Sequence, residues 1–167
     1  MLGLSLPAAA QVAAVASPSG PVMAGPYVVV DAATGETLLE RNAGASWYPA
    51  SLSKMMTIYI IFEELKSGRV MLSTPFALSE AARARPPSKL GLGPGQTITV
   101  EQGLQALVAR SANDVASGFA ERISGTEAAF AQRMTDTAHR LGMTATTFRN
   151  ASGLPDPGQV TTARDMA

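Results

Sequence analysis

The order of the expected elements constrains the fold most, because one β-hairpin precedes a run of helices. Residues 27–30 are Tyr-Val-Val-Val, a run typical of a strand, and residues 37–41 are expected to form a second strand after a turn at 32–36. After Pro49 the spacing of apolar residues becomes helical. An isolated two-stranded hairpin is only marginally stable, so this sheet is too small to stand alone. The order predicts an α+β or α/β fold with a helical subdomain.

Four helices of ordinary length are expected after Pro49. The first is expected to end at Gly68 and to bury the apolar residues that recur at helical spacing, namely Met55, Ile58, Phe62 and Leu65. The second follows a capping box at 99–102 and is expected to bury Leu104, Leu107 and Val108. The third is expected to bury Val115, Phe119 and Ile123. The fourth is expected to run from a Thr126 cap to a Gly142 stop and to bury Phe130, Met134 and Leu141. Residues 70–78 and 86–97 are expected to be irregular.

The two ends of the sequence differ from the middle. Residues 1–16 are apolar, rich in alanine and uncharged, which is typical of the tail of an export signal; a disordered Ala/Pro leader is the alternative. Residues 17–26 are rich in Pro, Gly and Ser and are interpreted as a linker. Thr162–Asp165 resembles the cap and first turn of a helix. Such a short helix has no stability of its own, so the fold is expected to continue beyond Ala167.

Composition excludes several classes of function. A chain of 167 residues is enough for one domain with a real core. Thirteen basic and thirteen acidic residues cancel without a basic stripe, so nucleic acid is not an expected partner. The absence of cysteine excludes thiol catalysis and cysteine-based zinc sites.

Ser51 and Lys54 form the strongest candidate for chemistry. They lie three positions apart where the first helix begins, so the lysine can lie over the serine hydroxyl. A serine becomes a good nucleophile when a neighbouring base removes its proton, and a desolvated neutral lysine can be that base. The helix start adds free N–H groups that favour developing negative charge. The alternative is an ordinary capping serine beside a solvated lysine.

Ser111 and Asn113 form a second candidate in the short break between two expected helices. Polar side chains there can point into a cleft, where Ser111 could relay a proton and Asn113 could bind a substrate amide or the lysine. A plain turn between helices is the alternative.

Together these motifs resemble the penicillin-recognising serine enzymes, and the flanking sequence resembles the D-alanyl-D-alanine carboxypeptidases among low-molecular-mass penicillin-binding proteins. Ser53 stands where threonine is common in that family. The resemblance runs from about Tyr27 to the end, through blocks 27–32, 34–35, 49–54, 87–90, 111–114, 141–143, 148–150, 153–154 and 162–167.

The resemblance implies a β-lactamase/transpeptidase-like fold for residues 27–167, and one role for each candidate residue. Ser51 would attack the carbonyl between the two terminal D-alanines of a peptidoglycan stem peptide, with Lys54 as general base. Ser111 would pass a proton to the departing D-alanine, and Asn113 would position the substrate. The resemblance also implies an exported protein of the bacterial periplasm or cell envelope, no metal or organic cofactor, and β-lactam antibiotics as covalent inhibitors.

The sequence departs from the family in one respect. The family's third motif, Lys-Thr-Gly on a sheet strand, does not occur in these 167 residues. Loss of one oxyanion donor costs about a hundred- to thousandfold in rate. The later sheet strands are therefore expected to be missing, and the chain alone is expected to be inactive and poorly folded. Membrane attachment would need sequence beyond Ala167.

Two rival functions and four other residues or segments complete the expectations. The rivals are a related β-lactamase, endopeptidase or esterase, and a non-catalytic remnant that binds cell-wall peptides. His139 is expected to face solvent and Asp114 to serve the first turn of its helix. Residues 150–155 are interpreted as a structured loop, and Lys89 as a surface charge.

Overall fold

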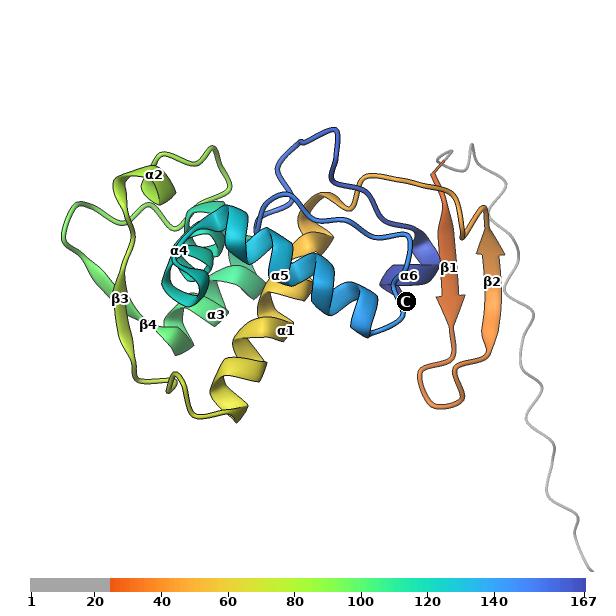
Figure 1. Ribbon diagram of the computed structural model, residues 1–167, viewed down its shortest axis with the longest axis horizontal. Coiled ribbons are helices and arrows are strands. Elements are labelled where there is room, and N and C mark those ends of the chain that lie inside the picture. The colour runs from red at the N-terminus through yellow and green to blue at the C-terminus, as the bar shows by residue number, and fades with distance from the viewer. Residues whose placement is uncertain (1–24) are drawn as a thin grey trace, which may run out of the picture.

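The computed structural model describes residues 25–167, and its elements follow the expected order (Figure 1). The hairpin stands at one end of the molecule, and the helices make up the middle and the opposite end. The expected signal remnant at 1–16 and most of the linker at 17–26 lie outside the described residues. No helix within residues 25–167 has both the length and the apolar composition needed to cross a membrane.

The predicted hairpin is confirmed. Strands β1 (Tyr27–Val30) and β2 (Thr37–Arg41) pair antiparallel, with one irregularity between Val29 and Val30. Asp31 shapes the turn, because its carboxylate accepts hydrogen bonds from the backbone N–H groups of residues 33 and 34, at 2.9 and 2.8 Å. These bonds stabilise the charged carboxylate and lower the pKa of Asp31. All five residues of β2 are exposed, so one side of this small sheet has no cover within the described chain.

Six helices and a second small sheet make up the rest of the described chain. The helices are α1 (Ser53–Lys66), α2 (Glu80–Arg83), α3 (Val100–Arg110), α4 (Asn113–Ser124), α5 (Glu127–Arg140) and α6 (Ala163–Met166). Strands β3 (Pro75–Ala77) and β4 (Thr97–Thr99) pair antiparallel at the end opposite the hairpin (Figure 1). Helix α4 lies at the centre, in contact with α1, α2, α3 and α5.

The core forms where these helices meet. Ile60 and Ile61 of α1, Val115 of α4, and Phe130 and Met134 of α5 are fully buried. Such residues each contribute about 1.5–3 kcal/mol relative to an exposed position. This core fixes α1 against α4 and α5, and so fixes the start of α1.

The expected helix starts are confirmed. Thr99 and Gln102 form a complete capping box at α3, and the Thr126 hydroxyl accepts a bond from the N–H of residue 129 at α5. Thr162 caps α6 in the same way, through the N–H of Asp165. Each cap satisfies a free donor of the first turn, which is why the signal is visible in sequence.

Several expectations about buried faces are wrong. Met55 and Phe62 are more than half exposed, because α1 turns Met56, Ile60 and Ile61 toward the core instead. Val108 is 74% exposed, and Leu141 lies after α5 with half its surface in solvent. Residues 70–78, expected to be irregular, contain β3, and β4 begins at Thr97, the last residue of the other such segment. These strands have three residues each, which is too short for a periodic pattern.

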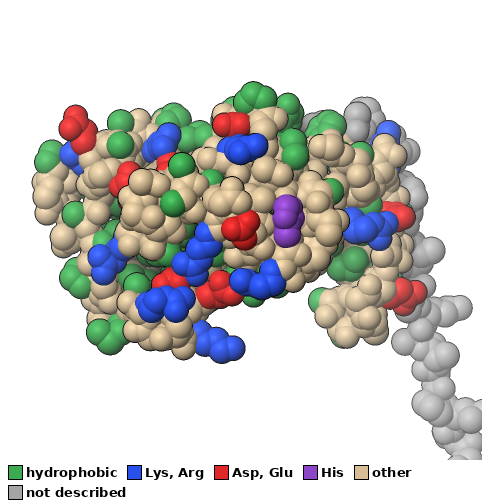
Figure 2. Space-filling model, viewed as in Figure 1, with side chains coloured by type: hydrophobic (Ala, Val, Ile, Leu, Met, Phe, Trp, Pro, Cys, Tyr) green, Lys and Arg blue, Asp and Glu red, His purple; other side chains and the backbone are tan. Residues whose placement is uncertain are grey.

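The surface is chemically mixed. Figure 2 shows basic and acidic side chains interspersed, with the single histidine at the surface. Arg69 and Arg133 both pair with the buried Glu64, and Arg140 pairs with Glu63. His139 is exposed, as expected.

Candidate active site

The candidate nucleophile lies in a tight turn that leads into α1. A 3-10 turn spans Ala50–Leu52, and the first turn of α1 follows directly. Ser51 is exposed, whereas Lys54 is only 3% exposed, so the hydroxyl faces outward and the amine lies beneath it. The two groups are 3.5 Å apart, from Lys54 Nζ to Ser51 Oγ. A short shift of the lysine would bring the amine within proton-transfer distance of the hydroxyl.

Two neutral oxygens hold the Lys54 amine from below. Its Nζ donates to Oδ1 of Asn113 at 2.7 Å and to the backbone carbonyl of Ser152 at 2.5 Å. Among residues 25–167, no carboxylate forms an ion pair with this lysine. Burial without a counter-ion disfavours the charged form and lowers the pKa of Lys54 from 10.5 to about 8. At pH 7 about one amine in ten is then neutral.

Asn113 is itself held in place. It is the first residue of α4, its Nδ2 donates to the carbonyl of Pro86 at 3.0 Å, and its backbone N–H donates to Ser88 at 2.8 Å. The bond to Pro86 uses the amide nitrogen, so the amide oxygen points at Lys54. Asn113 therefore connects the lysine to the segment that precedes β4.

Ser111 lies close by in sequence but does not join this cluster. It ends α3 in a left-handed conformation with φ of 52°, which turns the chain sharply into α4. Within the described residues, no hydrogen bond joins the Ser111 hydroxyl to Ser51, Lys54 or Asn113. The structure thus brings together three of the four candidate residues.

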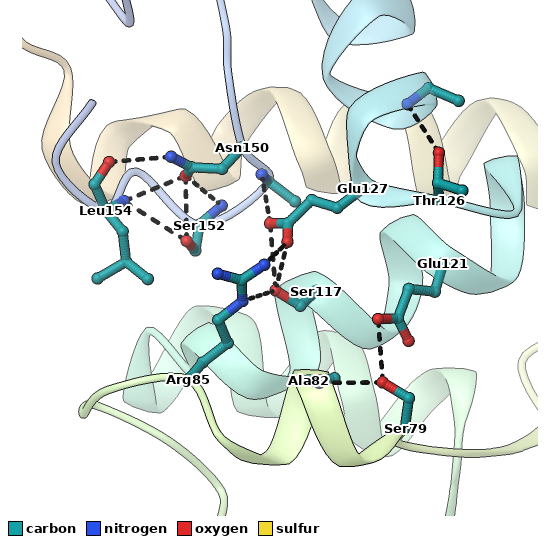
Figure 3. A network of polar contacts seen from close by, with 12 residues as sticks. Ser79, Ala82, Arg85, Ser117, Glu121, Thr126, Glu127, Asn150, Ser152 and Leu154 are labelled. Atoms are coloured by element: carbon teal, nitrogen blue, oxygen red, sulfur yellow. Dashed lines mark hydrogen bonds and ion pairs between the residues drawn. The ribbon is translucent and has the colours of Figure 1, made fainter. Parts of the chain in front are cut away.

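The loop at residues 150–154 forms the third side of the site. Asn150 Oδ1 accepts backbone N–H bonds from Ser152, Gly153 and Leu154 at 2.7–3.2 Å, which folds the loop around one side chain (Figure 3). This fold aims the Ser152 carbonyl at Lys54. The expectation of a structured loop is confirmed, and the loop also lines the site.

Gly153 is required where this loop meets the nucleophile turn. Its φ is +84°, and a Cβ atom there would lie 1.8 Å from the carbonyl oxygen of Ala50. Only glycine allows both the conformation and the approach. The residue before Ser51 is therefore packed directly against the loop that holds Lys54.

The sequence provided a partial signal for this loop. Asn150 with Ser152-Gly153 shortly after it is typical of a tight turn, since asparagine can bond the backbone that follows it. The acceptor of the lysine is a backbone carbonyl, however, and a carbonyl has no residue signature. Sequence reasoning could find the turn but not its contact with Lys54.

Asp114 is structural, as expected from its place in the first turn. Its buried carboxylate accepts the N–H groups of Leu90 and Gly91, both at 2.9 Å, and so fastens the preceding loop to α4. Lys89 is half-buried, with its amine on the Arg83 carbonyl at 3.0 Å, so the expectation of a plain surface charge is wrong.

A pocket of about 400 Å³ opens beside the nucleophile turn. Its walls come from the turn and from the loop that follows residue 152: Tyr48, Pro49, Ala50, Gly153, Leu154, Pro155, Asp156, Pro157 and Gln159. Proline, leucine and tyrosine make most of these walls apolar. The pocket provides room for an extended or small ligand next to Ser51.

This arrangement is suited to acyl transfer. A hydroxyl at a helix start lies above an amine that is partly neutral at pH 7, and the amine is oriented by two acceptors. The described residues contain no cluster of three or more His, Cys, Asp or Glu able to hold a metal ion.

Comparison with known proteins agrees with the geometry. A model of the family described as D-alanyl-D-alanine carboxypeptidase matches residues 11–167. The chain is 36% identical over 140 residues to the D-alanyl-D-alanine carboxypeptidase DacF of Bacillus subtilis, across 84% of this chain and 36% of that protein. It therefore spans little more than a third of the length of this curated relative.

Solved structures place the fold in the same group. The crystal structure of the D-alanyl-D-alanine carboxypeptidase DacD from Francisella tularensis superposes with a TM-score of 0.84 at 36% identity, covering 95% of this chain and 38% of that one. Penicillin-binding protein D2 from Listeria monocytogenes, solved in its ampicillin-bound form, gives 0.73 at 30% identity, with 85% and 58% coverage. The predicted β-lactamase/transpeptidase-like fold class is confirmed. The chain belongs to the D-alanyl-D-alanine carboxypeptidase family of serine hydrolases.

Proposed function

We propose that this chain carries the nucleophile and general base of a serine D-Ala-D-Ala carboxypeptidase, which removes the terminal D-alanine from peptidoglycan stem pentapeptides. The observation that carries the proposal is the buried Lys54 amine, which forms no ion pair within residues 25–167 and lies 3.5 Å from the Ser51 hydroxyl. Family membership supports the reaction class. Because the chain spans about a third of its curated relatives, the activity is proposed for the complete domain that contains this segment.

The reaction would proceed through an ester on Ser51. Neutral Lys54 takes the Ser51 proton as the serine oxygen attacks the carbonyl carbon of the D-Ala-D-Ala bond, which gives a tetrahedral oxyanion. Collapse of this intermediate breaks the C–N bond, and the departing D-alanine amine takes the proton that Lys54 received from Ser51. A relay of this proton through Ser111 would require the Ser111 hydroxyl to approach the amine when substrate binds. Water then attacks the ester with Lys54 as base, and releases the shortened peptide and Ser51.

The site residues divide this work between binding and proton transfer. The first N–H groups of α1 favour negative charge near Ser51. Asn113 would hold both the lysine and a substrate amide, and the pocket beside Tyr48 would receive the peptide. Penicillins would acylate the same serine, which fits a family with penicillin-bound members. Because peptidoglycan lies outside the cytoplasm, we place the complete protein in the bacterial cell envelope.

Labelling with a fluorescent penicillin tests the proposal in a complete domain that carries these residues. Ser51→Ala should abolish covalent labelling. Ser53→Ala is the matched control, because the Ser53 hydroxyl is buried without a hydrogen-bond partner among the described residues, and its loss should leave labelling intact. Labelling that survives Ser51→Ala would contradict the assignment of the nucleophile.

Product analysis separates the rival enzymes. A carboxypeptidase releases D-alanine from a stem pentapeptide and forms a long-lived adduct with a cephalosporin, whereas a β-lactamase turns the cephalosporin over. A wild-type domain that neither labels nor releases D-alanine would overturn the proposal.

A further inference from the structure

Glu127 occupies a position that the chemistry described above does not explain. It is the first residue of α5, and its side chain is only 12% exposed. An acidic residue at a helix start is favoured by the helix dipole, and that alone would account for an exposed carboxylate. This carboxylate instead points into the molecule, toward the loop and helix that hold Lys54 (Figure 3).

Three separate segments meet on this carboxylate. The backbone N–H of Ala151 donates to it at 3.2 Å, and the buried Ser117 hydroxyl lies 3.1 Å from both of its oxygens. The Arg85 guanidinium pairs with it, and also donates to Ser117 at 3.0 Å. A carboxylate can accept about four hydrogen bonds, so one side chain can join all three partners.

Each partner is next to a group that positions the lysine. Ala151 precedes Ser152, whose carbonyl accepts from Lys54. Ser117 lies one helical turn after Asn113, whose amide oxygen is the other acceptor.

Arg85 provides the third connection. It precedes Pro86, whose carbonyl fixes the Asn113 amide. The Ser152 carbonyl thus belongs to the residue after one that Glu127 holds, and Asn113 is linked to Glu127 through one turn of α4 and through the bond to Pro86.

We propose that Glu127 is a positioning residue for the Ser51–Lys54 site, which it serves by fixing the Ser152 carbonyl and the Asn113 amide relative to each other. The proposal rests on the proposed role of Lys54 as general base. Loss of the carboxylate would free the loop at 150–154 from α4 and leave the Ser117 and Ala151 donors unsatisfied. Misplacement of a catalytic group by about 1 Å can cost about a hundredfold in rate.

The decisive measurement follows Lys54 itself in the complete domain that contains this segment. In lysine-labelled protein, its ¹³Cε signal is the one that Lys54→Arg removes and that Lys66→Arg and Lys89→Arg retain. In the wild type the Lys54 signal should titrate near pH 8. Glu127→Ala should move this midpoint toward 10.5, because water that enters around a displaced amine stabilises its charged form. Glu127→Gln, which keeps the shape and one acceptor oxygen, should move it less.

Glu121→Ala is the matched control. Glu121 lies one helix earlier and also accepts a serine hydroxyl, that of Ser79 at 3.0 Å, but its carboxylate forms no hydrogen bond with Arg85, Ser117 or Ala151 (Figure 3). Its removal should leave the titration of Lys54 unchanged. Ser117→Ala removes one contact of Glu127 at little cost in volume, and should reproduce part of the Glu127→Ala shift even if the latter folds poorly.

Acylation in the complete domain gives the second readout. Glu127→Ala should lower the rate constant for covalent labelling by about 10- to 100-fold, with little change in the concentration of penicillin that half-saturates the enzyme. An unchanged Lys54 midpoint together with unchanged acylation in Glu127→Ala would overturn the proposal, whatever the effect on melting temperature. If the wild-type domain never labels, the proposed function fails, and the titration of Lys54 still decides the role of Glu127.

Discussion

Lys54 Nζ lies 2.7 Å from Asn113 Oδ1, so a neutral oxygen stands where a carboxylate would hold the lysine permanently charged. The amide orients the amine and favours the ammonium form much less than a carboxylate would. A buried lysine with this partner can lose its proton near neutral pH. The first prediction follows from this pairing.

Asn113→Asp should raise the pKa of Lys54, because a carboxylate at the same distance favours the ammonium form. Acylation at pH 7 should fall, and the rise of the rate with pH should move to higher pH. Fluorescent-penicillin labelling from pH 6 to 10 measures this shift. Asn42→Asp adds the same charge at an exposed position and should leave the profile unchanged. Identical profiles for Asn113→Asp and wild type would contradict the role of the neutral acceptor.

The wild-type acylation rate should rise with pH and level off above about pH 8–9. The rate should rise because only the neutral amine can accept the serine proton, and the pKa of Lys54 is about 8. Stopped-flow acylation across this range checks it. A rate that is flat between pH 6 and 9 would be incompatible with Lys54 as base.

Lys54→Ala should slow acylation by about 10²- to 10⁴-fold, the usual contribution of a general base, while non-covalent binding of the drug persists. Lys54→Arg keeps a positive charge but provides no neutral form at these pH values, and should be equally slow. Binding and acylation can be separated by the dependence of labelling rate on drug concentration. Normal acylation in either variant would rule out the assignment.

Gly153→Ala should destabilise the fold and impair labelling together. The new Cβ would lie 1.8 Å from the Ala50 carbonyl, so the nucleophile turn must shift. Gly142→Ala is the matched control, since its φ is +91° but nothing lies within 4 Å of a new Cβ. Both should lose about 1–3 kcal/mol from backbone strain, and only Gly153→Ala should also lose labelling. Thermal melting and labelling on the same samples distinguish the two.

Glu64 should make the chain sensitive to acid. Hydrogen bonds from Arg69 and Arg133 lower the pKa of Glu64 from 4.5 to about 2. The folded state therefore holds this proton more weakly than the unfolded state, and the stabilisation present above pH 4.5 is lost as pH falls toward 2. Glu64→Gln should flatten the loss of stability over this range in urea melts. Glu101→Gln, at an exposed site, should leave the dependence of the unfolding free energy on pH unchanged.

Much of the fold could be predicted because its signals are local. Caps at Thr99, Thr126 and Thr162 mark helix starts through bonds within three or four residues. The buried face of α1 could not be read in the same way, since apolar residues occur all around this helix and only its neighbours decide which of them are buried. The short strands β3 and β4 depend on each other across the chain.

In the candidate site too, the contacts between residues near in sequence could be predicted and those between distant segments could not. Ser51 and Lys54 share one helical turn, so their proximity follows from their spacing. The approach of Asn113 depends on the packing of α4 against α1, and no spacing rule provides it. The Ser152 carbonyl and Glu127 have no motif at all, because their roles come from where distant segments meet.

The partners of Lys54 also set an order of events in folding. Its acceptors lie 59 and 98 positions further along the chain, and closing loops of such length is entropically costly. During synthesis the lysine is therefore made long before anything can bury it, and it stays an ordinary ammonium group in the nascent chain. Its pKa falls only when the loop at 150–154 docks, so reactivity toward penicillin would report that docking step.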